Sequence, residues 1–174
     1  MQIEDGQGTG SLVGVDQHRI KTSSRSQNRM WYESIDNGQA FTWANATYDY
    51  AAADTILAVQ NDSTTKKLHI HEIHICGDTE TAFTIHVPKN VTMAGTVVTG
   101  VNLNRTSANV AEATAKANET GNTQANVIYR SILLAKTKQV ISTPGLVLGK
   151  NDTIAVDLVT DGGAAYVVVF GFYL

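Results

Sequence analysis

Cysteine, proline and long apolar runs are scarce or missing in this sequence. Its 174 residues include one cysteine, Cys76, and 2 prolines, so no disulfide can form within the chain. No stretch reaches the roughly 18 consecutive apolar residues of a membrane-spanning helix. The net charge of -3 also lacks the basic excess that is typical of nucleic-acid binders. We therefore expect one soluble globular domain, with no membrane segment and no nucleic-acid partner.

The first 53 residues differ in composition from the rest of the chain. They begin Met-Gln-Ile-Glu-Asp, which lacks the basic and then apolar pattern of a secretion signal, so we expect synthesis in a cytoplasm. Between Asp16 and Arg29, four basic residues and one acidic residue give a charge of +3: Arg19, Lys21, Arg25 and Arg29 against Asp16. Such a segment either stays solvated or orders on a partner. We interpret it as part of an N-terminal arm.

The remainder of the chain is rich in residues that favour strands and turns. It contains most of the 21 threonines and 12 asparagines of the sequence, a mix that favours strands over long helices. Short apolar runs alternate with turn residues from position 54 onward, as in an all-β sandwich. The candidate strands are residues 55–59, 68–76, 81–87, 96–103, 127–134, 139–142, 146–148, 153–159 and 164–174. We predict an all-β fold, an antiparallel β-sandwich over residues 54–174 preceded by an arm and an aromatic-rich lead-in over residues 1–53.

One alanine-rich segment, residues 108–118, permits two interpretations. Asn109 and Glu112 have the spacing of a helix capping box. The alanines at 111, 113, 115 and 117 nevertheless alternate with larger residues, which is the period of a strand. We favour an extended segment with a face of small residues.

Three histidines share the apolar run Leu68–Cys76. His69 and His71 would project from the same face of a strand and could chelate a metal. No third ligand is forced, because a bulge would rotate His74 away from them and His86, one strand later, is the only other histidine nearby in the sequence. We therefore expect no metal and no other cofactor. In a regular strand, Leu68 and Ile70 would face away from Ile73 and Ile75. A β-bulge near Glu72 would return all four aliphatic side chains to one side.

No recognisable catalytic motif is present. His71-Glu72-Ile73-His74 is one residue short of the zinc-protease spacing, and the glycines near residues 6–10 lack the strand and helix of a dinucleotide site. Asp152, Asp157 and Asp161 are interpreted as turn and surface groups. We expect that the protein is not an enzyme.

Half of the 12 aromatic residues lie between positions 31 and 50: Trp31, Tyr32, Phe41, Trp43, Tyr48 and Tyr50. This dense segment could pack on the core of the chain itself or enter an interface. The C-terminal run from Tyr166 to Leu174 is also strongly apolar. These two segments are expected to place more apolar side chains on the surface than is usual for a monomeric sandwich. We therefore predict that the protein associates with itself.

Several segments resemble structural proteins of tailed bacteriophages. They are Ile3-Glu4-Asp5-Gly6-x-Gly8-x-Gly10, Thr55-Ile56-Leu57-Ala58-Val59-x-Asn61, Gly95-Thr96-x-x-Thr99-Gly100-x-Asn102-Leu103-Asn104-Arg105 and Leu148-Gly149-x-Asn151-Asp152-Thr153-Ile154-Ala155-Val156. The ending Phe170-Gly171-Phe172-Tyr173-Leu174 also resembles the last strands of trimeric jelly rolls of the complement and tumour-necrosis-factor type. The resemblance implies a jelly-roll virion protein.

This resemblance implies a head decoration or cement protein on the capsid surface, made in the cytoplasm of a host bacterium. Its partners would be the major capsid protein or neighbouring virion subunits. We expect capsid binding through Arg19, Lys21, Arg25, Arg29, Trp31 and Tyr32. We expect a homo-oligomer, most simply a trimer, with Tyr166, Phe170, Phe172 and Tyr173 at its interface. The alternatives are a carbohydrate-binding or receptor-binding module of a tail or baseplate, and a small metal-dependent enzyme using His69 and His71.

Overall fold

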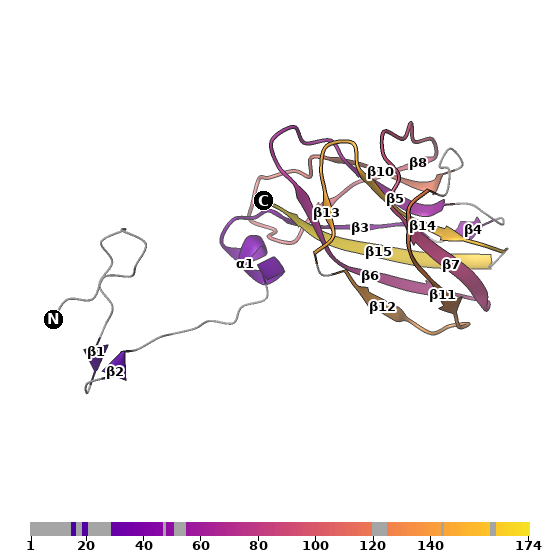
Figure 1. The fold of residues 1–174 in the computed structure, drawn as a ribbon, viewed down its shortest axis with the longest axis horizontal. Helices are drawn as coiled ribbons and strands as arrows, with labels where there is room; N and C mark the ends of the chain where they lie inside the picture. The colour runs from indigo at the N-terminus through magenta and orange to yellow at the C-terminus, as the bar shows by residue number, and fades with distance from the viewer. Residues whose placement is uncertain are drawn as a thin grey trace.

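The computed structural model is a sandwich of two antiparallel β-sheets (Figure 1). It describes residues 15–16, 19–20, 29–46, 48–50, 55–119, 125–143, 145–160 and 163–174. The seven-stranded sheet has the order β12 (Gln139–Ser142), β6 (Leu68–Gly77), β15 (Gly163–Tyr173), β3 (Ala40–Ala44), β9 (Val101–Asn102), with β13 (Val147–Leu148) also on β6 and β4 (Tyr48–Tyr50) on β15. The six-stranded sheet has the order β11 (Val127–Leu133), β7 (Thr81–His86), β14 (Thr153–Leu158), β5 (Thr55–Asn61), β10 (Ala113–Glu119), β8 (Thr96–Val98). The predicted all-β fold with antiparallel sheets is confirmed.

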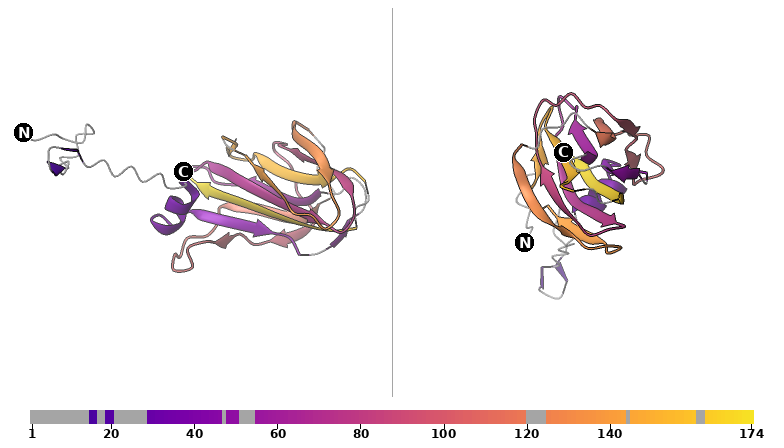
Figure 2. Two further views of the ribbon diagram at one scale, coloured as in Figure 1. Left: turned by 90° about the horizontal axis from the view of Figure 1, so that it is seen from below. Right: turned by 90° about the vertical axis from the view of Figure 1, so that its right-hand side faces the viewer.

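The two sheets face each other (Figure 2), and the buried side chains of the hydrophobic core lie between them. Trp43, Phe41, Phe83 and Tyr173 are its largest aromatic side chains, and the rings of Phe41 and Tyr173 meet edge to face at 5.6 Å. Alternate residues of each strand point into this space, because side chains of a strand project to its two faces in turn. A single core therefore joins both sheets.

Each of the nine predicted strand segments contains at least one strand of the structure. The segment 96–103 is divided, because β8 and β9 belong to different sheets. The chain turns between them at Gly100, where an added Cβ would lie 2.6 Å from the indole nitrogen of Trp43. A glycine is required there so that the turn can approach the core tryptophan.

The predicted bulge in β6 is confirmed. Glu72 pairs with Phe170 of β15, and Ile70 pairs with the next residue, Gly171, so His71 is the extra residue. On either side of it, the four aliphatic side chains of β6 all lie in the core: Leu68, Ile70, Ile73 and Ile75. The bulge thus keeps the aliphatic side of the strand inward along its whole length.

The alanine-rich segment is extended, as favoured from its period of two. In β10, Ala115 and Ala117 are buried against the core side of β5. Glu112 does not cap a helix. Its carboxylate accepts a hydrogen bond of 2.5 Å from Lys66 Nζ, which holds the pKa of Glu112 below its usual value.

The predicted boundary at residue 53 was wrong. Strands β3 and β4 precede it and pair with β15, so the sandwich begins before the predicted position. Before residue 29, only the backbone pairing of β1 (Val15–Asp16) with β2 (Arg19–Ile20) is described. One short helix, α1 (Arg29–Ile35), lies beside the C-terminus (Figure 1). Within the described part of the chain, no helix has the length and apolar character to cross a membrane.

Candidate functional site

Helix α1 presents the described part of the expected partner-binding set. Met30 packs with Ala40 and Phe172, which fixes the helix to the outer face of the seven-stranded sheet. Trp31 and Tyr32 are exposed, at 47% and 38%. Lys21 and Arg25 lie outside the described residues, and for Arg19 only the backbone is described. The capsid-binding role of these side chains stays a prediction.

The Arg29 guanidinium is held in place by its own helix. Its Nη2 lies 2.6 Å from Glu33 Oε1, and its Cζ lies 5.5 Å from the centre of the Tyr32 ring. The other Glu33 oxygen accepts a hydrogen bond of 2.6 Å from Asn37 Nδ2. Glu33 is buried, and each of its carboxylate oxygens has a polar partner. Its fixed position therefore sets the direction in which the Arg29 guanidinium points.

The four predicted interface aromatics of β15 divide between surface and interior. Tyr166 is exposed and Phe170 is half-buried. Phe172 is covered by α1, and Tyr173 is only 2% exposed within the core. Tyr173 was therefore wrongly assigned to a surface, because β15 is a central strand and this residue points between the sheets. Tyr166 and Phe170 remain predicted interface residues.

The histidines of β6 lie on the outer face of the seven-stranded sheet, where His69 and His74 contact β15. The His69 ring stacks on Phe172, with centroids 5.1 Å apart and planes 9° apart. His74 lies 4.9 Å from Phe170 and 3.0 Å from Glu72 Oε1. Among the residues that the structure describes, no three potential ligands are grouped as a metal would require. That the protein binds no metal stays a prediction, which elemental analysis of the purified protein tests.

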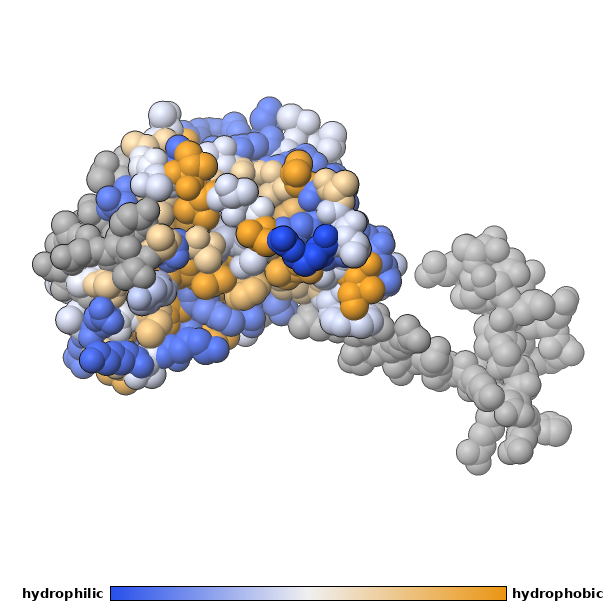
Figure 3. All heavy atoms as spheres, turned by 180° about the vertical axis from the view of Figure 1, so that it is seen from behind, coloured by the Kyte–Doolittle hydropathy of each residue, from blue (hydrophilic) through white to orange (hydrophobic). Residues whose placement is uncertain are grey.

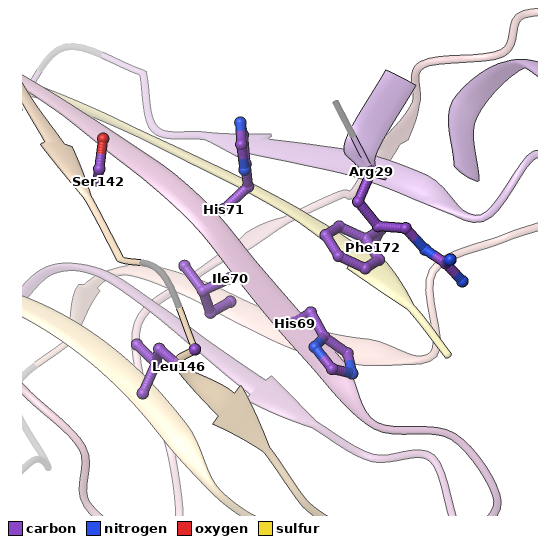
Figure 4. Close-up of a pocket in the computed structure, with 8 residues that line it drawn as sticks. Arg29, His69, Ile70, His71, Ser142, Leu146 and Phe172 are labelled. Atoms are coloured by element: carbon purple, nitrogen blue, oxygen red, sulfur yellow. The ribbon is translucent and has the colours of Figure 1, made fainter. Parts of the chain in front are cut away.

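A hollow of about 380 Å³ lies beside these histidines (Figure 4). Arg29, His69, His71 and Ser142 provide its polar groups. In Figure 4, His71 and Ser142 project to the same side of neighbouring strands. This hollow could not be predicted from the sequence, because Arg29 is 40 residues from His69 along the chain and only the fold brings α1 beside β6.

The edge strands β11 and β12 expose a group of apolar side chains, which we call the apolar edge: Val127, Ile128, Tyr129, Ile132, Leu134 and Val140. Within the described residues, β11 pairs only with β7 and β12 only with β6. Gln139 joins the two strands by donating a hydrogen bond of 2.6 Å to the Ile132 carbonyl. Other apolar side chains reach the surface among polar ones on the face shown in Figure 3. The sequence predicted these strands but not that they form an edge.

A buried polar pair lies in the six-stranded sheet. His86 Nε2 is 2.5 Å from Asp157 Oδ2, and Thr55 Oγ1 donates a hydrogen bond of 2.6 Å to Asp157 Oδ1. Both partners are essentially inaccessible to solvent, so the interpretation of Asp157 as a surface group was wrong. Asp157, rather than the histidine, is the central member, which is not the order of a hydrolase triad. We interpret the pair as structural.

Comparison of the chain with protein-family models, with curated proteins and with solved structures finds no match. The features available for a functional assignment are consequently those of the molecule itself. They are the apolar edge, the exposed aromatics of α1, and the polar hollow beside β6. The first of these is formed by six exposed apolar side chains.

Proposed function

We propose that the protein is a non-enzymatic structural subunit of a tailed-phage virion, a capsid decoration or cement protein that assembles through its apolar edge. The observation that carries the assembly role is the exposure of six apolar side chains, five on two adjacent edge strands and Leu134 directly after β11. The assignment to a virion rests on the resemblance of the segments described above. An edge of this kind is a template for association with another chain.

The strand order supports a jelly roll. Nine strands of the described part of the chain have at least four residues. Apart from β10, which extends the six-stranded sheet beyond β5, they are, in chain order, β3, β5, β6, β7, β11, β12, β14 and β15. Successive strands of this set alternate between the two sheets, except that β7 and β11 both belong to the six-stranded sheet. Their spatial order is β3–β15–β6–β12 in the seven-stranded sheet and β5–β14–β7–β11 in the six-stranded sheet. Eight antiparallel strands divided in this way between two sheets are typical of jelly rolls, which occur in viral capsid proteins.

Burial of the apolar edge would favour association strongly. Complete burial of one large aliphatic side chain stabilises by about 1.5–3 kcal/mol relative to exposure. Several half-exposed side chains on one edge therefore offer enough free energy to offset part of the entropy lost on association. The unpaired backbone groups of β11 add hydrogen bonds if an extended segment binds there.

Charge favours a cyclic trimer over a two-fold dimer. Residues 127–142 contain Arg130, Lys136 and Lys138 and no carboxylate. A two-fold contact would bring two such edges together, with like charges facing each other. A head-to-tail contact instead places the edge on a different surface of the next copy, and three such contacts close a ring.

Light scattering of the full-length protein and of Ile132→Lys tests the assembly proposal. Ile132 is 55% exposed at the apolar edge, whereas Ile35 of α1 is 50% exposed elsewhere, so Ile35→Lys is the matched control. We expect a trimer for the wild type and for Ile35→Lys, and a monomer for Ile132→Lys. A wild-type monomer at high concentration would overturn the assembly proposal, and a dimer would exclude the trimer.

The second candidate is a receptor-binding or carbohydrate-binding module of the tail or baseplate. The polar hollow with its aromatic wall favours it, since sugars bind through polar groups and aromatic rings. Quantitative mass spectrometry of purified particles separates the two functions. A head decoration protein is expected in many copies, whereas a tail module is expected in few.

A further inference from the structure

The hollow beside β6 combines cationic and hydrogen-bonding groups with an apolar floor. Arg29, His69, His71 and Ser142 are its polar members, and Phe172 and Leu146 are apolar (Figure 4). These residues come from α1, β6, β15, the end of β12 and the segment that joins β12 to β13. Its volume of about 380 Å³ is that of a small ligand site.

Two of the polar groups are held before any ligand arrives. The ion pair with buried Glu33 orients the Arg29 guanidinium, while the planar guanidinium retains N–H donors for another acceptor. The His69 ring is fixed by its parallel stack on Phe172. Side chains that are already ordered lose little conformational entropy on binding.

The electrostatic surroundings favour a negative ligand. The pKa of His69 is lowered by partial burial and then by the positive charges of Arg29 and Lys67, with Glu33 opposing them. Of the described residues lining the hollow, β15 and the β12–β13 connection contribute no titratable side chain, and β6 contributes His71. Glu33 offsets much of the Arg29 charge, so a negative ligand would be attracted by the remaining N–H donors of Arg29, by the charge of Lys67 and, once it is protonated, by His69.

We propose that this hollow binds a small organic carboxylate, with the carboxylate group beside the Arg29 guanidinium and the His69 imidazole and the carbon skeleton against Phe172 and Leu146. Guanidinium groups pair with planar carboxylates through two parallel hydrogen bonds. The apolar floor favours a ligand with a carbon skeleton over an inorganic anion. A sugar acid and an aliphatic acid share this chemistry. The site does not depend on the assembly proposed above.

Histidine NMR of the full-length protein tests the site at constant ionic strength. The probes are glucuronate, propionate, neutral glucose and inorganic phosphate. We expect saturable shifts of the His69 ring signals with glucuronate or propionate, and a rise of the His69 pKa on binding, because a nearby anion stabilises the imidazolium. Binding should tighten as the pH falls below about 6.5, the ordinary histidine pKa, because His69 then gains its proton.

Arg29→Gln is expected to weaken carboxylate binding about tenfold, the loss of one charge-assisted pair. Arg105→Gln is the matched control, since Arg105 is exposed in another loop and the change in charge is identical. Tighter binding of glucuronate than of propionate identifies a sugar acid, and the reverse identifies an aliphatic acid. Equal binding of glucose or phosphate, equal loss in the two arginine variants, or no saturable shift with either carboxylate would overturn the proposal.

Discussion

Individual buried polar residues of this sandwich are supported by specific partners. Asp157 is buried, yet both of its oxygens are engaged, one by His86 and one by Thr55. Burying a charged or polar group without a hydrogen-bonding partner costs free energy of folding. Loss of one member of this cluster should therefore leave the others buried without partners and destabilise the fold. The sequence could not show this, because the three residues are joined by strand pairing rather than by proximity in the chain.

Asp157→Ala is expected to destabilise the protein by about 3 kcal/mol, because it leaves His86 buried without its carboxylate partner. Asp78→Ala is the matched control, since Asp78 is exposed in a turn. Its cost should stay within about 0.5 kcal/mol. Urea unfolding of both variants measures the difference. Equal free energies of unfolding would show that the buried pair contributes nothing.

Tyr173 gives the protein a defined sensitivity to alkaline pH. Burial, followed by the charges of Glu112 and Asp62, raises the pKa of its phenol. The folded chain therefore keeps this proton where the unfolded chain, with an ordinary pKa of about 10, releases it. The unfolded state then binds fewer protons, so the free energy of unfolding falls as pH rises above about 10.

Tyr173→Phe should remove this loss. Between about pH 8 and about pH 10.5, the wild type is expected to lose about 1 kcal/mol more of its unfolding free energy than the variant does. Tyr166→Phe makes the same chemical change at an exposed position and should follow the wild type. Urea unfolding at both pH values measures this, and parallel losses in all three proteins would contradict the prediction.

Among the elements, β6 shows how a sequence pattern can specify an irregular strand. Its aliphatic residues change phase between Ile70 and Ile73, and one extra residue at His71 restores them to the core. The facing residue Gly171 suits the irregularity, since an added Cβ there would lie 2.9 Å from the His69 carbonyl oxygen. A one-residue change of phase was therefore sufficient to predict the bulge.

Deletion of His71 should be tolerated. The shortened strand would read Leu-His-Ile-Glu-Ile-His-Ile, which places every aliphatic residue on the core side without a bulge. Deletion of His74 is the control, because it brings Ile73 and Ile75 together and sends one of them outward. We expect cooperative thermal unfolding for the first variant, with a loss below about 2 kcal/mol, and no folded protein for the second. The opposite ranking by circular dichroism would refute this explanation of β6.

The elements that could be predicted are those whose signal is local. The alternation of apolar and polar residues located β7. The alternation of alanines with larger residues correctly favoured a strand over a helix for β10. Strand β3 was missed as part of the sandwich because Ala40–Ala44 is short and lies in an aromatic segment that could equally enter an interface. The apolar edge and the polar hollow depend on which strands lie side by side, and no periodicity in one segment contains that information.

At the scale of the whole molecule, the sandwich and the N-terminal segment have separable roles. The strand pairings of the two large sheets lie within residues 40–174, and β1 pairs with β2. Removal of residues 1–28 retains Arg29 and α1, so we expect an unchanged thermal midpoint of unfolding. Circular dichroism checks this, and a large fall in the midpoint would mean that the segment contributes to the folded domain.

Under the proposed function, the same truncation is expected to weaken attachment of the protein to phage capsids that were assembled without it. The segment from Asp16 to Arg29 carries +3 on an otherwise acidic chain, and each partly exposed ionic contact contributes about 0.2–1 kcal/mol. Because screening acts over about 8 Å at physiological ionic strength and over less in higher salt, full-length binding should decline along a salt series. Full-length protein with Arg19→Gln, Lys21→Gln and Arg25→Gln separates charge from length and should bind nearly as poorly as the truncated protein. Equal, salt-independent binding by all three proteins would place attachment in the sandwich.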